Sequence, residues 1–312
     1  KSFSNGAGRI SLIFGNYVNS NDIYTCINYF NYIQREKMNY KNKEKFIAHA
    51  IYLTGTILVL YPFFSILFLA LSEPGKRISG FVLPSGIYFD NFIKAWVGGS
   101  FNTALLNSFI VVVFVVLVTL ICATLAAYAF EKLNIFGITP LFALLLIGLV
   151  LPYESIVISY YYGMRSLGLV NTHLSLILPQ IGLSIPFSIF WLRASFKSIP
   201  KSLSEAAMIE GAGRWVILIK ILLPQMIPAL LTLTVLLFMW TWNEFLLALI
   251  MIQDADMRTA PLALSYFAGN KRYGDPAITA AAAIWVALPV LIIYIFLQRR
   301  FISGMVTGSI KE

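Results

Sequence analysis

The sequence predicts an all-α integral membrane protein with six transmembrane helices. Of its 312 residues, 59% are hydrophobic and only 12% are charged, whereas a soluble domain is roughly half apolar and about one quarter charged. Six stretches without Asp, Glu, Lys or Arg are each long enough to supply the about 20 residues that a helix needs to cross a bilayer. A soluble fold of this size could not hide so much apolar surface, so the composition excludes an ordinary soluble protein.

The apolar runs are continuous and rich in Leu, Ile, Val and Phe, which favours helices over the short alternating strands of an outer-membrane barrel. We expect the helices, in chain order, at 47–71, 104–130, 139–160, 173–195, 225–250 and 279–298. The chain therefore divides into an N-terminal segment, a membrane domain and a C-terminal tail, at residues 1–46, 47–298 and 299–312.

The distribution of basic residues predicts the orientation of the helices. The side that holds both termini would carry 16 of the 23 Lys and Arg residues, and the other side would carry 7. Because cytoplasmic segments are enriched in these residues, we expect both termini in the cytoplasm and loops 72–103, 161–172 and 251–278 outside. The net charge of +9 mostly follows from this bias, so we expect no nucleic-acid partner.

Two of the predicted outer loops differ in character. Phe89, Phe92 and Trp96 lie in loop 72–103, and such aromatic residues are typical of a segment at the lipid headgroups. Loop 251–278 is polar and contains glycines, so we expect it to project as a flexible arm.

Residues 1–37 differ from the rest of the chain, because Gly, Asn, Ser and Tyr are scattered through them without a sustained apolar period. They also lack the compact apolar region of a signal peptide. Met38 then opens a short basic run that leads into the first predicted helix. We hypothesise that Met38 is a natural start and that 1–37 is a non-native extension; the alternative is a small cytoplasmic arm.

The most informative segment is the predicted cytoplasmic loop of residues 196–224. Ser202, with Glu205 three residues later, forms a capping box that predicts a helix beginning at Ser202. Gly211 predicts the end of that helix, because glycine tolerates the positive φ of a helix C-terminus. A second helix is expected to follow and to meet the fifth membrane helix at Pro224.

The predicted loop helix has an unusual surface. Ala206 and Ala207 would let another backbone approach, while Met208 and Ile209 offer adaptable apolar contacts. Exposed apolar side chains in the cytosol lower solubility unless a partner covers them. We therefore expect a docked partner protein; the alternative is a loop that folds back under its own helices.

These residues carry a family resemblance. Glu205-Ala206-Ala207 is followed at fixed spacing by Gly211 and then by Leu223-Pro224, which resembles the EAA loop of binding-protein-dependent ABC importer permeases. The resemblance implies the type I ABC importer permease fold and a loop that docks into an ATPase subunit. The coupling residues that it implies are Glu205, Ala206, Ala207, Met208, Ile209, Gly211, Leu223 and Pro224.

Shorter matches resemble the carbohydrate-uptake branch of this family, in particular its smaller, maltose-type permease subunit. They include Tyr128-Ala129-Phe130, Leu151-Pro152 and Trp242-Asn243-Glu244-Phe245. The resemblance implies import of a sugar or a related solute across the cytoplasmic membrane of a bacterium. It also implies three kinds of partner: a second permease subunit, an ATPase dimer and an extracellular solute-binding protein.

The tail of the chain also resembles that branch. Its glycines and its lack of periodicity favour an extended segment. The resemblance implies that this tail contacts the ATPase, through Gly304, Gly308 and Lys311.

The sequence contains no phosphate-binding loop of the form GxxxxGK[ST], so we expect no ATPase activity in this chain. ATP and Mg²⁺ would be used by the partner ATPase, and no cofactor is expected to bind here directly. The two histidines and two cysteines are not clustered in the sequence, and we expect no metal site.

Polar residues inside the predicted helices are the candidates for a solute path, because each is costly in a membrane unless it lines water or has a partner. They are Asn107, Glu154, Asn243 and Glu244. Sugars also stack on aromatic rings, so we expect Trp240, Trp242 and Tyr153 as neighbours of the solute. The alternative for the two asparagines is that they only tie helices together. Two other functions remain open: an ABC permease for an oligopeptide, polyamine or phosphate, and a proton-coupled carrier that uses the two glutamates.

Overall fold

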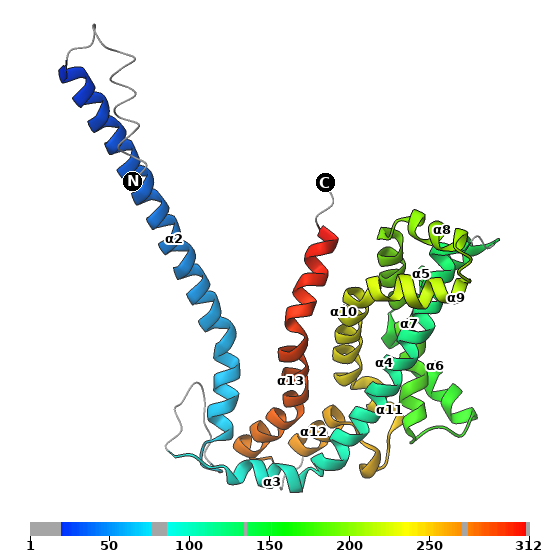
Figure 1. Cartoon of the computed structure of the whole chain (residues 1–312). Coiled ribbons are helices and arrows are strands. Elements are labelled where there is room, and N and C mark those ends of the chain that lie inside the picture. Colours follow the sequence, from blue (N-terminus) through cyan, green and yellow to red (C-terminus); the bar gives the residue numbers. More distant parts are fainter. Residues whose placement is uncertain (1–19, 76–85, 134–135, 151, 270–273, 310–312) are drawn as a thin grey trace. The chain divides into compact units, whose positions relative to one another are not determined.

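The computed structural model describes residues 20–75, 86–133, 136–150, 152–269 and 274–309, and this part of the chain is helical, without strands. Figure 1 shows the order of the helices. The chain divides into two compact units between Phe64 and Ser65, within helix α2 (Ser20–Ala70). The predicted all-α class is therefore confirmed.

Among the described residues, five helices are long and apolar enough to cross a membrane, and a bent helix pair brings the number to six. The five spans are Glu44–Ala70 of α2, Phe101–Lys132 (α4), His173–Ser198 (α7), Arg214–Trp242 and Pro276–Phe296 of α13. This agrees with the predicted six crossings when the bent pair counts as one span.

The third predicted helix is broken. Helix α5 (Ile138–Val150) and helix α6 (Tyr153–Ser166) meet at an angle of 100°. Pro152 is the N-cap of α6, with φ −66° and ψ 119°. A proline has no N–H to donate inside a helix, so Pro152 is suited to the start of α6 and not to the interior of one longer helix. The helix predicted over 139–160 is therefore divided into two helices, which can count as one span.

The fifth predicted helix is shifted toward the N-terminus. It combines α9 (Arg214–Val216), the π-helical turn η1 (Ile217–Leu222) and α10 (Leu223–Trp242), and α11 (Leu246–Met251) follows after a break. The junction predicted at Pro224 agrees with the start of α10, which has this proline in its first turn, but the helices on the two sides join into one span, Arg214–Trp242, without a break. The π turn widens the helix just before the proline, where an ordinary hydrogen bond cannot form.

Both ends of the described chain are more helical than expected. Helix α2 begins at Ser20, well before the predicted start at residue 47, and α13 (Pro276–Ser309) continues through most of the tail. The prediction of an extended tail was wrong as far as Ser309. Gly304 and Gly308 lie within α13, since a glycine costs a helix only about 1 kcal/mol. Lys311 lies outside the described residues.

The core lies where α4, α7, α10 and α13 meet. Helix α4 packs most extensively on α7, and α10 contacts α4, α7 and α13 (Figure 1). Large buried side chains fill these contacts, among them Leu192, Phe196 and Leu233. On α13, Ala281 and Ala282 are fully buried, and such small residues let helix backbones approach closely in a membrane.

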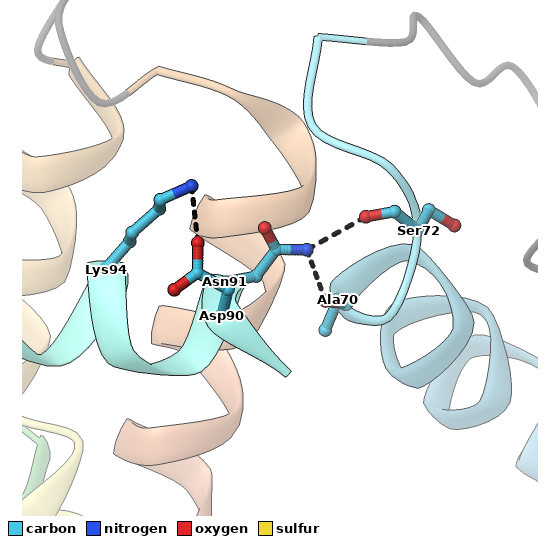
Figure 2. A network of polar contacts seen from close by, with 5 residues as sticks. All are labelled: Ala70, Ser72, Asp90, Asn91 and Lys94. Atoms are coloured by element: carbon cyan, nitrogen blue, oxygen red, sulfur yellow. Dashed lines mark hydrogen bonds and ion pairs between the residues drawn. The ribbon is translucent and has the colours of Figure 1, made fainter. Parts of the chain in front are cut away.

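The end of α2 is tied to helix α3 (Asp90–Gly98) by a buried amide (Figure 2). The Nδ2 group of Asn91 donates to the carbonyl oxygens of Ala70, at 2.9 Å, and Ser72, at 2.8 Å. Asn91 is fully buried, whereas the neighbouring Asp90–Lys94 ion pair, at 2.6 Å, is largely exposed. The amide therefore satisfies carbonyl groups that the end of a helix leaves without partners.

Two aromatic residues of α3, Phe92 and Trp96, are half-buried and contact α13. The indole N–H of Trp285 on α13 donates to the carbonyl oxygen of Phe92, at 3.2 Å, and the ring of Trp96 lies 4.8 Å from that of Trp285. Phe89 is exposed. Phe92 and Trp96 thus pack on a partner helix while remaining half-buried, and their position at the lipid headgroups stays a prediction.

Candidate functional site

The predicted coupling segment forms a short helix, α8 (Lys201–Ile209). The helix begins one residue earlier than predicted, with Pro200 as its N-cap and no side-chain cap. The capping-box prediction was wrong, because the fixed φ of Pro200 starts the helix and places Ser202 inside its first turn.

The end of α8 agrees with the prediction. Gly211 has a φ of +82°. The N–H of Gly211 donates to the carbonyl oxygen of Met208, at 3.0 Å, and that of Ala212 donates to the carbonyl oxygen of Ala207, at 2.9 Å. These two bonds form a Schellman motif, which requires a positive φ at the glycine. The helix, glycine turn and helix expected over 196–224 are thus confirmed.

The α8 helix has a buried side and an exposed side. Ser204 and Ala207 are buried, and α8 packs on η1. We call the exposed side the α8 surface; its residues are Glu205, Ala206, Met208, Ile209 and Gly211. Met208 is 55% and Ile209 is 88% exposed. Such apolar exposure is typical of a contact site for another protein.

The two alanines of the motif have different surroundings. Ala206 is exposed, whereas Ala207 is buried in the chain's own core. The expectation that both present a small side chain to a partner was wrong for Ala207, which instead lets α8 approach η1. Leu223 and Pro224 lie in the first turn of α10, beyond η1.

Helix α4 is bonded to the chain on both sides of the α8 surface. The Nζ group of Lys132 donates to the carbonyl oxygen of Ile199, at 2.9 Å, just before α8. The hydroxyl of Tyr128 donates to the carbonyl oxygen of Arg214, at 3.5 Å, just after the turn. The segments that flank α8 are thus linked to α4, the helix with the most extensive packing in the core.

A pocket of about 260 Å³ lies near the end of α10 that is remote from α8. Residues of α5, α6, α7 and the end of α10 line it, including Tyr153, Gln180, Ser184, Trp240, Thr241 and Glu244. We call it the Glu244 pocket. It lies next to two interruptions of the membrane helices, one at Pro152 and one between α10 and α11. Irregular backbone at membrane depth is tolerated where protein covers it or where it lines a cavity.

Glu244 is held in a defined position in this pocket. Its Oε1 atom accepts one hydrogen bond from the hydroxyl of Tyr153 and one from the N–H of Leu247, both at 2.8 Å. The first bond connects the beginning of α6 with the break after α10, and the second satisfies an N–H in the first turn of α11. The predicted candidates Trp240 and Glu244 thus line one pocket.

The other predicted path residues lie elsewhere. The Nδ2 group of Asn107 donates to the carbonyl oxygens of Asp256, at 2.8 Å, and Arg258, at 3.1 Å. Its Oδ1 atom is 2.9 Å from Nε2 of His173. Asn107 therefore has the tying role that was its alternative, and the predicted flexible arm is held firmly at 256–258.

Asn243 and Glu154 are both exposed. Asn243 ends α10, and its Nδ2 group donates to the carbonyl oxygen of Met239, at 2.8 Å. Neither residue lines the Glu244 pocket. The predicted arm contains η2 (Ala255–Met257) and α12 (Ala260–Gly269), whereas its residues 270–273 lie outside the described part of the chain.

Gln180, Ser184 and Thr241 line the pocket but were not among the predicted candidates. A signal for Gln180 exists in the sequence, because its amide stands in a long apolar run of α7, and polar residues within a membrane helix often mark a ligand path. Hydroxyl residues are common in such helices, and the sequence alone does not distinguish these two from the others.

The chain matches the family of binding-protein-dependent transport system inner membrane components over residues 133–306, more than half of its length. The chain therefore belongs to this family of transport permeases. Since several of its helices can cross a membrane, it is a multi-pass membrane protein.

Curated relatives cover most of the chain. The trehalose transport system permease protein SugB of Mycobacterium tuberculosis is 32% identical over 81% of this chain and 92% of its own length. The melibiose/raffinose/stachyose import permease protein MelC of Bacillus subtilis is 30% identical over 80% of this chain and 91% of its own length.

Two solved structures have a similar fold. One is a bacterial ABC transporter involved in the import of the acidic polysaccharide alginate, with a TM-score of 0.70 and 23% identity, covering 92% of this chain and 99% of that one. The other is a bacterial alginate ABC transporter in complex with a pentasaccharide-bound periplasmic protein, with a TM-score of 0.62 and 18% identity, covering 83% of this chain and 96% of that one. Together they support the importer permease fold.

Proposed function

We propose that this chain is the membrane-spanning permease subunit of an ATP-driven importer that takes up a sugar or a related solute from an extracellular binding protein. Family membership carries the permease assignment. The names of relatives that transport trehalose or melibiose, raffinose and stachyose support a sugar as the solute. The membrane is the cytoplasmic membrane of a bacterium.

The observation that carries the coupling mechanism is the α8 surface. Its apolar residues, Met208 and Ile209, are exposed on a short helix that ends in a defined glycine turn. In the proposal this surface docks on one subunit of an ATPase dimer. ATP and Mg²⁺ bind to that dimer, and this chain holds no cofactor of its own. A second permease subunit completes the membrane pore.

The bonds around α8 support a simple route for the movement. Closure of the ATPase dimer displaces α8, and Lys132 and Tyr128 transmit the displacement to α4 because they bond to the backbone on both sides of the α8 surface. Rocking of α4 with its packed neighbours then opens the pore to the other side. Such rigid-body movement needs an ATPase that binds one state of the permease more tightly than the other.

The tail is a second contact with the ATPase in this proposal, through Gly304, Gly308 and Lys311. Since α13 continues to Ser309, Gly304 and Gly308 would be presented on a helix.

The alternatives are less well supported. A proton-coupled carrier would use Glu154 and Glu244, but Glu154 is exposed outside the pocket and Glu244 already accepts two hydrogen bonds. Family membership also favours transport driven through a binding protein. An ABC permease for an oligopeptide, polyamine or phosphate has no support from the names of the relatives.

A pair of glutamates tests the coupling role. Glu205 lies on the α8 surface, and Glu210 follows it as the C-cap of the same helix; both are exposed. Glu205→Ala should weaken binding of the ATPase to the permease pair by about 10- to 100-fold, which is the value of a charged hydrogen bond at an interface. Glu210→Ala should bind the ATPase normally. Equal binding by wild type and both variants, measured by co-purification from nanodiscs, would contradict the proposal.

A further inference from the structure

The Glu244 pocket contains a carboxylate oxygen that is free to bind a ligand. Both hydrogen bonds to Glu244 are made to Oε1, from Tyr153 and Leu247. The other oxygen, Oε2, has no hydrogen-bond partner in the described part of the chain. The position of the carboxylate is thus fixed by one oxygen, and the second remains as an acceptor for a hydroxyl or an amide N–H.

Gln180 supplies a second free polar group. It lines the pocket and is only 6% exposed, yet its amide makes no hydrogen bond to any described residue. Buried polar side chains nearly always have a partner. The amide atoms of Gln180 are not fully enclosed, so they reach the open space of the pocket, where a ligand or a water molecule can complete their hydrogen bonds.

Trp240 adds an aromatic wall. Its side chain is 49% exposed, and the edge-to-face contact with Phe187, at 4.8 Å between the rings, holds the indole in place. The indole N–H has no partner among the described residues. An indole offers an apolar face and one donor, a combination suited to a ring that carries both C–H and O–H groups.

We propose that the Glu244 pocket is a solute subsite that takes one neutral, hydroxyl-rich sugar ring and rejects acidic sugars. This inference rests on the proposed function and names the substrate class. Glu244 and Gln180 bind the ring hydroxyls, Trp240 covers one face, and the charge of Glu244 repels a uronic acid. The volume of about 260 Å³ is below the about 300–1,000 Å³ of typical ligand pockets, so the pocket holds a single ring of a longer sugar.

The breaks in the helices support this location. Pro152 interrupts one membrane span beside the pocket, and residues 243–245 interrupt another. In other transporters, interrupted helices at the membrane midplane form the substrate site, since their free backbone groups can face a polar solute. The hydrogen bond between Tyr153 and Glu244 connects the two breaks across 91 residues of sequence.

The test uses the permease pair with its ATPase dimer in nanodiscs, without the solute-binding protein, and saturation-transfer NMR titrations. The probes are three neutral sugars, trehalose, raffinose and diacetylchitobiose, and one acidic sugar, digalacturonate. Wild type should bind at least one neutral sugar and should not bind digalacturonate. Trp240→Ala should weaken neutral-sugar binding by tenfold or more. Phe190→Ala is the matched control, because Phe190 is 48% exposed on α7 and does not line the pocket.

The charge is tested separately. Glu244→Gln keeps an acceptor for Tyr153 and Leu247 but removes the negative charge. The saturation-transfer signal of digalacturonate should therefore rise roughly fivefold or more above the wild-type background. Three results would each overturn the inference: wild type prefers digalacturonate, neutral sugars bind equally well to Trp240→Ala, or none of the four probes binds. Co-purification of the ATPase, scored in the same preparations, separates these failures from a failure of the permease assignment.

Discussion

Replacing Gly211 with alanine should strain the turn after α8 without creating a steric clash. A Cβ atom at this position would meet no heavy atom within 4 Å, but φ is +82°. Gly211→Ala therefore destabilises the turn only through the backbone conformation that it requires. A non-glycine residue in the left-handed region loses about 1–2 kcal/mol, which lowers the population of the correct turn about 5- to 30-fold.

The assay is the apparent affinity of the ATPase for the permease pair in nanodiscs. Gly211→Ala should weaken it by up to the same 5- to 30-fold, because the turn sets the position of the α8 surface. Gly211→Asn should be intermediate, since asparagine tolerates this conformation better than alanine does.

Gly213 provides a matched control two residues away. Its Cβ position is also open, but its backbone is extended, with φ −70° and ψ 159°, a conformation that any residue adopts. Gly213→Ala should therefore bind the ATPase as wild type does. Equal affinities of Gly211→Ala and Gly213→Ala would refute the conformational argument.

Three further predictions concern other parts of the chain. Asn107→Ala removes the hydrogen bonds that hold residues 256–258, which should lower the free energy of local opening of this loop by about 2–3 kcal/mol. Amide hydrogen exchange in the loop should then be roughly 30- to 150-fold faster. Unchanged exchange would show that other contacts hold the loop. Asn91→Ala should lower the thermal stability of the purified protein by about 2 kcal/mol, and Asp90→Ala, which breaks only an exposed pair, by less than about 1 kcal/mol; equal losses would contradict the role of the buried amide. Deletion of residues 304–312 should lower coupled ATPase activity without preventing membrane insertion, and unchanged transport would count against the tail contact.

The membrane spans could be predicted well from the sequence, because the bilayer imposes a length and an apolar composition that charge-free runs reveal directly. The interruptions within the spans were harder to predict from the sequence. The break at Pro152 carries a sequence signal, but Pro224, which has the same signal, lies inside a continuous helix after a π turn. A proline alone therefore does not decide between a break and a local adjustment.

The α8 turn was predictable in part because a single glycine determines it. Which alanine faces inward depends on the packing of α8 against η1, and the sequence pattern did not show this for Ala207. The Glu244 pocket depends on a contact between Tyr153 and Glu244, which are 91 residues apart. The sequence showed both as candidates but not that they meet, and Asn107 gave an equally strong polar signal although it bonds to the backbone of Asp256 and Arg258.

The central claim is that the α8 surface is the contact site for the ATPase. Ile209, the most exposed of the large hydrophobic residues of α8 at 88%, allows the most direct measurement when it is replaced by a photo-crosslinking amino acid in the complete importer. The same replacement at Leu167, which is 65% exposed in the turn after α6, is the control. The account predicts a crosslink to the ATPase from position 209 and none from position 167. No crosslink from position 209, or an equal one from position 167, would contradict it.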